Sequence, residues 1–94
     1  MNENKFQRIL INRIKQIFPD CVILKNDPNY MPAIPDLLIL NGPNWAMLET
    51  KRSEDSSFQP NQEYYIEKLD SMSYARAVYP ENLEEVLDEL QQSL

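Results

Sequence analysis

Histidine is absent from this chain, and cysteine occurs only once, at Cys21, among 94 residues. The absence of histidine excludes zinc fingers that need this ligand and every catalytic centre in which an imidazole binds a metal or transfers a proton. A single cysteine forms no intramolecular disulfide, which is typical of an intracellular protein. With no histidine to activate its thiol, Cys21 is expected to pack within an apolar strand rather than to act as a nucleophile.

Long apolar runs are also missing. We therefore expect neither a membrane span nor a secretory signal, and we place the protein in the cytoplasm, which is the host cytoplasm if a phage encodes it. The chain length indicates a single domain that spans residues 1–94. A domain of this size has a small core, and dimerisation adds to its stability. An apolar share of 43% is sufficient for a packed fold.

The spacing of apolar residues predicts an α/β fold with the order α-β-β-β-α-β-α. A helix is expected over residues 2–17, before Pro19, and short strands over residues 21–25, 37–40, 45–51 and 74–79. A second helix is predicted with Pro60 in its first turn, and a third follows Pro80. Residues 41–44, Asn-Gly-Pro-Asn, are turn formers that predict a hairpin between the second and third strands.

Two carboxylates and an amine stand at the open end of that hairpin. Pro35-Asp36 precedes one strand, and Glu49-Thr50-Lys51 closes the other after twelve intervening residues. In a symmetric hairpin Asp36 faces Glu49, and directly opposed Cβ atoms lie roughly 4.5–5.5 Å apart. Side chains alternate along a strand, so Glu49 and Lys51 share one face. We therefore expect Asp36, Glu49 and Lys51 to converge.

Carboxylates this close repel each other, and without compensation one of them keeps its proton near neutral pH. A divalent cation removes the conflict, and hard oxygen ligands suit Mg²⁺ or Mn²⁺. Such a centre is typical of phosphodiester hydrolysis, with Lys51 either stabilising negative charge or orienting a water. The alternative interpretation makes Asp36 a turn residue and treats Glu49 and Lys51 as a solvated pair on an edge strand.

With Pro35-Asp36 and Glu49-Thr50-Lys51 as its signature, the sequence resembles the PD-(D/E)XK nuclease superfamily. Within it, the chain is most similar to the small stand-alone VRR-NUC domains of bacteriophages and bacteria. The similarity runs from about Ile34 to the C-terminus and includes Gln62 at the start of a helix. It implies a restriction-endonuclease-like core, in which helices flank a mixed central sheet. It also implies that Glu3, on the first helix, joins Asp36 and Glu49 as a metal ligand.

The resemblance implies a Mg²⁺- or Mn²⁺-dependent endodeoxyribonuclease with Asp36, Glu49 and Lys51 as catalytic residues. Gln62 either holds the catalytic water or a phosphate, or caps strand carbonyls. The expected protein is a homodimer acting on branched DNA such as Holliday junctions, because a chain with one site cuts two strands only in pairs. Two alternatives remain: a phage homing or nicking endonuclease with sequence preference, and a non-catalytic nucleic-acid-binding adaptor.

The net charge of −6 opposes nucleic-acid binding, which depends on Lys and Arg releasing counterions from phosphates. Five acids on the last helix account for most of this charge, and the rest of the chain carries −1. DNA contacts are expected from basic side chains on the first helix and beside the motif, and from an aromatic residue in the loop before it. These residues are Lys5, Arg8, Lys15, Arg52 and Tyr30.

Overall fold

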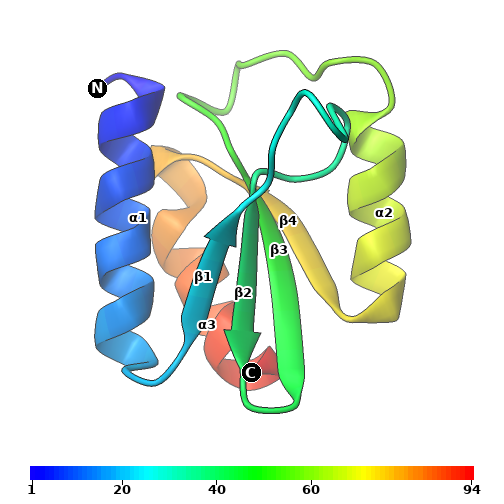
Figure 1. The fold of residues 1–94 in the computed structure, drawn as a ribbon. Helices are drawn as coiled ribbons and strands as arrows, with labels where there is room; N and C mark the ends of the chain where they lie inside the picture. Colours follow the sequence, from blue (N-terminus) through cyan, green and yellow to red (C-terminus); the bar gives the residue numbers. More distant parts are fainter.

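The computed structural model describes all residues from Met1 to Leu94 and places a four-stranded sheet among three α-helices (Figure 1). In chain order the elements are α1 (Glu3–Ile17), β1 (Val22–Lys25), β2 (Leu37–Asn41), β3 (Asn44–Thr50), α2 (Gln62–Met72), β4 (Tyr74–Val78) and α3 (Leu83–Ser93). A short 3₁₀ helix, Pro80–Asn82, leads into α3. The predicted α/β order α-β-β-β-α-β-α is confirmed. None of the helices has both the length and the apolar character needed to cross a membrane.

The sheet is mixed, as expected, and its strands lie in the order β1-β2-β3-β4. β1, β2 and β3 are antiparallel neighbours, whereas β4 is parallel to β3. Gly42 and Pro43 connect β2 to β3, and Gly42 has a φ of 60°. A positive φ at Gly42 followed by the fixed negative φ of proline is the combination that a type II′ turn requires. Leu38 pairs with Met47, so the predicted symmetric register is confirmed.

The two faces of the sheet differ in burial. α1 and α3 cover one face, and the hydrophobic core there consists of Phe6, Leu10, Ile14, Leu37, Ile39, Ala46, Leu48, Tyr74, Val78, Leu83, Val86, Leu87 and Leu90. α2 packs against β4 and contributes no side chain to this core. On the face that α1 and α3 do not cover, the side chains of Val22, Leu24 and Leu40 remain exposed.

Several boundaries differ from the sequence prediction, most of them by one residue. α2 begins at Gln62 and does not contain Pro60, because Asn61 adopts a left-handed φ of 71° that is incompatible with the helix. β1 begins at Val22, and Cys21 packs against the core from just outside the strand. β4 ends at Val78, and the next residue, Tyr79, caps the 3₁₀ helix.

Candidate active site

β3 carries the acidic and basic residues of the motif at its C-terminal end. The strand is internal, with β2 on one side and β4 on the other. The backbone N–H of Lys51 donates to the carbonyl of Val78 at 2.8 Å, which extends the β3–β4 pairing one residue beyond Thr50. Glu49 and Lys51 are each only 8% exposed. The interpretation of these residues as a solvated pair on an edge strand is therefore wrong.

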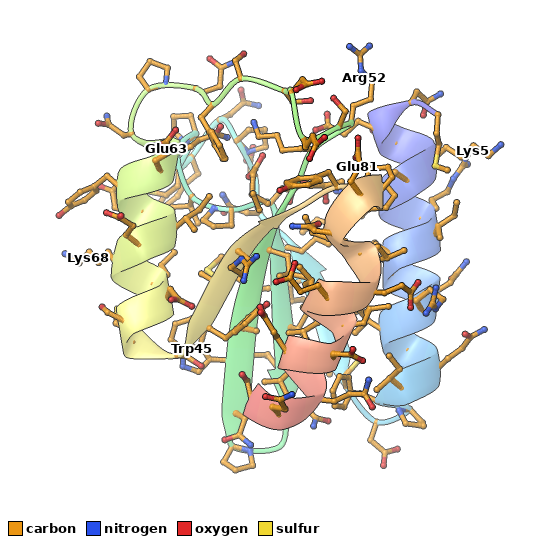
Figure 2. All side chains as sticks on the ribbon, turned by 180° about the vertical axis from the view of Figure 1, so that it is seen from behind. Lys5, Trp45, Arg52, Glu63, Lys68 and Glu81 are labelled. Atoms are coloured by element: carbon orange, nitrogen blue, oxygen red, sulfur yellow. The ribbon has the colours of Figure 1, made fainter.

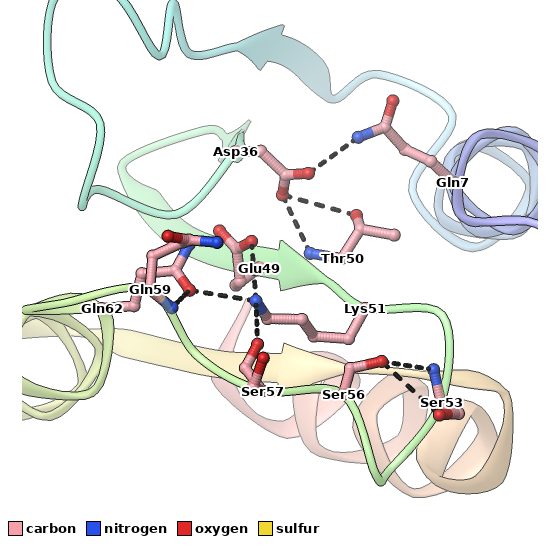
Figure 3. Close-up of polar contacts among 10 residues, drawn as sticks. All are labelled: Gln7, Asp36, Glu49, Thr50, Lys51, Ser53, Ser56, Ser57, Gln59 and Gln62. Carbon is pink, nitrogen blue, oxygen red and sulfur yellow. Dashed lines mark hydrogen bonds and ion pairs between the residues drawn. The ribbon is translucent and has the colours of Figure 1, made fainter.

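Asp36 lies directly before β2, where antiparallel pairing brings the start of β2 to the end of β3. Its Oδ1 atom accepts hydrogen bonds from the backbone N–H of Thr50 at 3.0 Å and from the Thr50 hydroxyl at 3.4 Å. Its Oδ2 atom accepts from Nε2 of Gln7, on α1, at 2.9 Å (Figure 3). The carboxylate of Asp36 is therefore fixed by β3 and α1 together, and it is not a free turn residue.

The ammonium group of Lys51 is enclosed by side chains and backbone. Its Nζ atom lies 3.8 Å from Oε2 of Glu49. It donates to Oε1 of Gln62 at 3.0 Å and to the carbonyl of Ser57 at 3.1 Å (Figure 3). The ring of Phe58 lies 4.9 Å from Nζ, within the range of a cation–π contact. The expected convergence of Glu49 and Lys51 is observed, and Gln62 joins them.

Burial raises the pKa of both carboxyl groups. The pKa of Asp36 rises to about 6, because burial outweighs the stabilising hydrogen bond from the Thr50 N–H and because the charge of Glu3 adds repulsion. The pKa of Glu49 rises to about 7, first through burial and then through repulsion by Asp36, against the attraction of Lys51. The electrostatic conflict expected from the sequence is therefore present in the fold.

Glu3 lies in the first turn of α1 and is exposed. It lines a cavity of about 490 Å³ whose other lining residues are Asn2, Lys51, Arg52, Ser56 and Ser57, none of them hydrophobic. No group of three or more Asp, Glu, Cys or His side chains is arranged to hold a metal ion. Glu3 therefore does not form a common ligand cluster with Asp36 and Glu49, and its role as a metal ligand stays a prediction.

The residues expected to contact DNA lie on the surface. Lys5, Arg8 and Lys15 are exposed along α1, and Arg52 is exposed at the rim of the polar cavity. Figure 2 shows Lys5 and Arg52 projecting outward near the N-terminal end of α1. Tyr30 is 80% exposed in the loop between β1 and β2. The structure thus brings Arg52 next to Lys51 at the polar cavity, whereas Lys5, Arg8 and Lys15 do not line it.

Two glutamines make contacts at the site that the sequence did not predict, although Gln62 itself was expected there. Gln7 lies one helical turn after Glu3 and therefore on the same side of α1, where it reaches Asp36. The amide oxygen of Gln62 accepts from Lys51 and from the backbone N–H of Gln59 at 2.8 Å, and its amide nitrogen donates to no strand carbonyl. Helical spacing is a signal that could have indicated Gln7, whereas the partner of Gln62 depends on the loop over residues 52–61.

Comparison with known proteins supports the fold. No protein-family model matches the chain, and no curated protein matches it. A solved structure described as a "VRR_NUC domain protein" superposes with a TM-score of 0.68 at 18% sequence identity, and the match covers 100% of this chain and 88% of the other. The match therefore includes the motif hairpin and all three helices. The chain has the fold of a VRR-NUC domain.

Proposed function

We propose that this protein is a Mg²⁺- or Mn²⁺-dependent endodeoxyribonuclease that hydrolyses phosphodiester bonds, acts as a homodimer and prefers branched DNA such as Holliday junctions. The observation that carries the proposal is the meeting of the carboxyl groups of Asp36 and Glu49 with the ammonium group of Lys51 at the end of β3. Glu49 and Lys51 are buried there, and Asp36 is half-buried. The fold shared with a VRR_NUC domain protein supports it.

The donor chemistry of Asp36 and Glu49 fits a hard divalent cation. Both side chains offer carboxylate oxygens, and Mg²⁺ typically binds through one or two carboxylates while water and substrate phosphate complete its shell. The pKa of each group is raised by burial and by a neighbouring negative charge, and a cation would offset both causes. When bound, Mg²⁺ or Mn²⁺ supplies a Lewis acid at the phosphate.

Lys51 is suited to act on the phosphate because its position is already defined. Two hydrogen bonds, to Gln62 and to the Ser57 carbonyl, hold its ammonium group beside Glu49. A positive charge that is oriented in advance stabilises developing negative charge without reorganising during the reaction. Lys51 also lines the polar cavity, so the residue that carries this charge lies beside the space that a substrate would enter.

The lining of that cavity favours the sugar-phosphate backbone of DNA. It contains no apolar or aromatic side chain on which a base could stack. Arg13 and Arg76 are neutralised by Glu84 and Glu89, whereas the cations expected to contact DNA make no ion pair. These free cations are Lys5, Arg8, Lys15 and Arg52. A protein that binds DNA through its phosphates recognises the shape of the DNA rather than its base sequence. This agrees with a preference for branched DNA.

The uncovered sheet face supports the homodimer. Val22, Leu24 and Leu40 are 52%, 49% and 37% exposed on β1 and β2. Val22 pairs with Leu40 and Leu40 with Trp45, so these side chains point to the same side of the sheet. Apolar patches of this kind mark interaction surfaces. The apolar side of α3 is buried in the core and is not available to a second subunit.

The test is a cleavage assay on matched substrates: linear duplex, single strand, splayed flap and four-way junction, each with Mg²⁺, Mn²⁺ or EDTA. We expect metal-dependent cutting that is fastest on the junction and that vanishes in Asp36→Ala. Asp27→Ala is the matched control, because Asp27 is an exposed acid in the neighbouring loop. Junction binding without cutting by the wild type in either metal would overturn the nuclease proposal and favour the adaptor.

A further inference from the structure

Gln7 is the one residue of α1 that donates a hydrogen bond to the carboxylate of Asp36. Its side chain is partly buried, and its Nε2 atom donates to Oδ2 of Asp36 across 29 positions of sequence, at 2.9 Å. Figure 3 shows the Gln7 amide extending from α1 with its nitrogen toward Asp36 and its oxygen turned away. The cleavage chemistry proposed for Asp36, Glu49 and Lys51 does not by itself require this hydrogen bond.

The two oxygens of Asp36 have different surroundings. A carboxylate oxygen offers about two lone-pair sites. Oδ1 already accepts two hydrogen bonds, from the backbone N–H and the hydroxyl of Thr50. Oδ2 accepts only one, from Gln7. Oδ2 therefore keeps an acceptor site for a cation beside the hydrogen bond from the Gln7 amide.

We infer that Gln7 is a positioning residue that orients Oδ2 of Asp36 toward the divalent cation, and this inference rests on the proposed function. The hydrogen bond links α1 to the motif strands and restrains rotation of the carboxylate. A neutral amide is suited to this role because it donates to an anion without adding charge to a site in which the carboxylates of Asp36 and Glu49 already repel each other. Hydrogen-bond partners of metal ligands typically change metal affinity by roughly 10–100-fold.

The test measures Mn²⁺ binding by calorimetry in the absence of DNA, with Gln7→Met as the variant. Methionine keeps the length of glutamine but donates no hydrogen bond, so we expect affinity for Mn²⁺ to fall roughly 10-fold. Gln16→Met is the matched control, because Gln16 is exposed on the same helix and forms no hydrogen bond with the site. Circular dichroism and the melting temperature establish that both variants are folded.

A second measurement uses the wild-type protein and does not depend on any variant folding. In a ¹⁵N-labelled sample, the side-chain amide resonances of Gln7 should shift during a Mg²⁺ titration, and those of Gln16 should not. Unchanged Mn²⁺ affinity in folded Gln7→Met, or a Gln7 amide that is insensitive to Mg²⁺, would overturn the positioning role while the nuclease proposal stands. Failure of the wild type to bind either metal would overturn both.

Discussion

Lys51 and Gln62 are joined by a buried hydrogen bond in which Nζ donates to Oε1 at 3.0 Å. The two side chains belong to the end of β3 and the start of α2, and Gln62 is only 6% exposed. The same Oε1 atom accepts from the backbone N–H of Gln59. Since a buried ammonium group is costly without acceptors, Gln62 holds Lys51 in place and fixes the end of the intervening loop.

Gln62→Met should therefore reduce cleavage without reducing DNA binding. Methionine offers no strong acceptor to Lys51 or to the N–H of Gln59. The ammonium group then keeps only the Ser57 carbonyl and the Glu49 carboxylate as partners, and its position is less defined. A misplacement of about 1 Å in a catalytic group costs on the order of 10²-fold in rate. Loss of the two hydrogen bonds accepted by Gln62 lowers the free energy of unfolding by about 1–3 kcal/mol. The measurements are single-turnover cleavage, DNA affinity in EDTA and thermal unfolding.

The control for this substitution is Gln92→Met, because Gln92 is exposed near the end of α3 and far in sequence from the site. We expect it to leave rate, affinity and stability unchanged. A folded Gln62→Met protein that cleaves at the wild-type rate would show that Lys51 does not depend on Gln62 for its position.

The raised pKa values of Asp36 and Glu49 predict how the stability of the metal-free protein depends on pH. On folding, the pKa of Asp36 rises from 3.8 to about 6 and that of Glu49 from 4.5 to about 7.

Between about pH 4 and pH 7 the folded state thus holds more protons than the unfolded state, and the free energy of unfolding falls as pH rises through this window. Each pKa unit corresponds to about 1.4 kcal/mol. Glu49→Gln should therefore stabilise the metal-free protein by roughly 2–3 kcal/mol at pH 8 and by little at pH 4.

Chemical denaturation in EDTA at the two pH values measures this difference. Glu85→Gln, an exposed acid on α3, serves as the control and should show no such dependence on pH. Addition of Mg²⁺ at pH 8 should stabilise the wild type and leave Glu49→Gln nearly unaffected. Equal stability of Glu49→Gln and the wild type at pH 8 would mean that the buried carboxylate costs the fold nothing.

Local patterns in the sequence were sufficient to predict the motif hairpin and most elements. The Asn-Gly-Pro-Asn turn determines the register of β2 and β3, and this register places Asp36 beside Glu49. The hydrogen bonds of Gln7 and Gln62 were not predictable in this way. Helical spacing places Gln7 on the Glu3 side of α1, but its contact with Asp36 depends on the packing of α1, and the contact of Gln62 depends on the path of the loop over residues 52–61. Pro60 misled the prediction of α2, because proline favours a helix start but does not determine whether the next residue is helical.

Lys5 and Arg8 should contribute to DNA binding, whereas Arg13 on the same helix should not. Arg13 is held by Glu84 through two hydrogen bonds at 2.8 and 3.0 Å, whereas Lys5 and Arg8 form no ion pair. Replacing Lys5 and Arg8 with alanine should weaken junction binding and reduce the slope of log K against log salt by up to about two, since each cation neutralises at most one phosphate. Arg13→Ala removes one positive charge, as each of these two substitutions does, and is the matched control. An unchanged salt slope in the double variant would exclude this surface from the DNA interface.

Leu24→Glu should prevent formation of the proposed homodimer. Leu24 is half exposed on β1 and points to the same side as Leu38, on the sheet face that α1 and α3 leave uncovered. A stable interface buries about 800 Å² of accessible surface on each partner and excludes charge from its centre, so a buried glutamate there would oppose association.

Sedimentation velocity measures the change, with Tyr64→Glu as the control because Tyr64 is exposed on α2 and not on the sheet. The folded monomer should keep its Mn²⁺ site but cut the two strands of a junction in independent events, because each chain holds one site. A Leu24→Glu protein that remains dimeric would place the subunit contact on another surface.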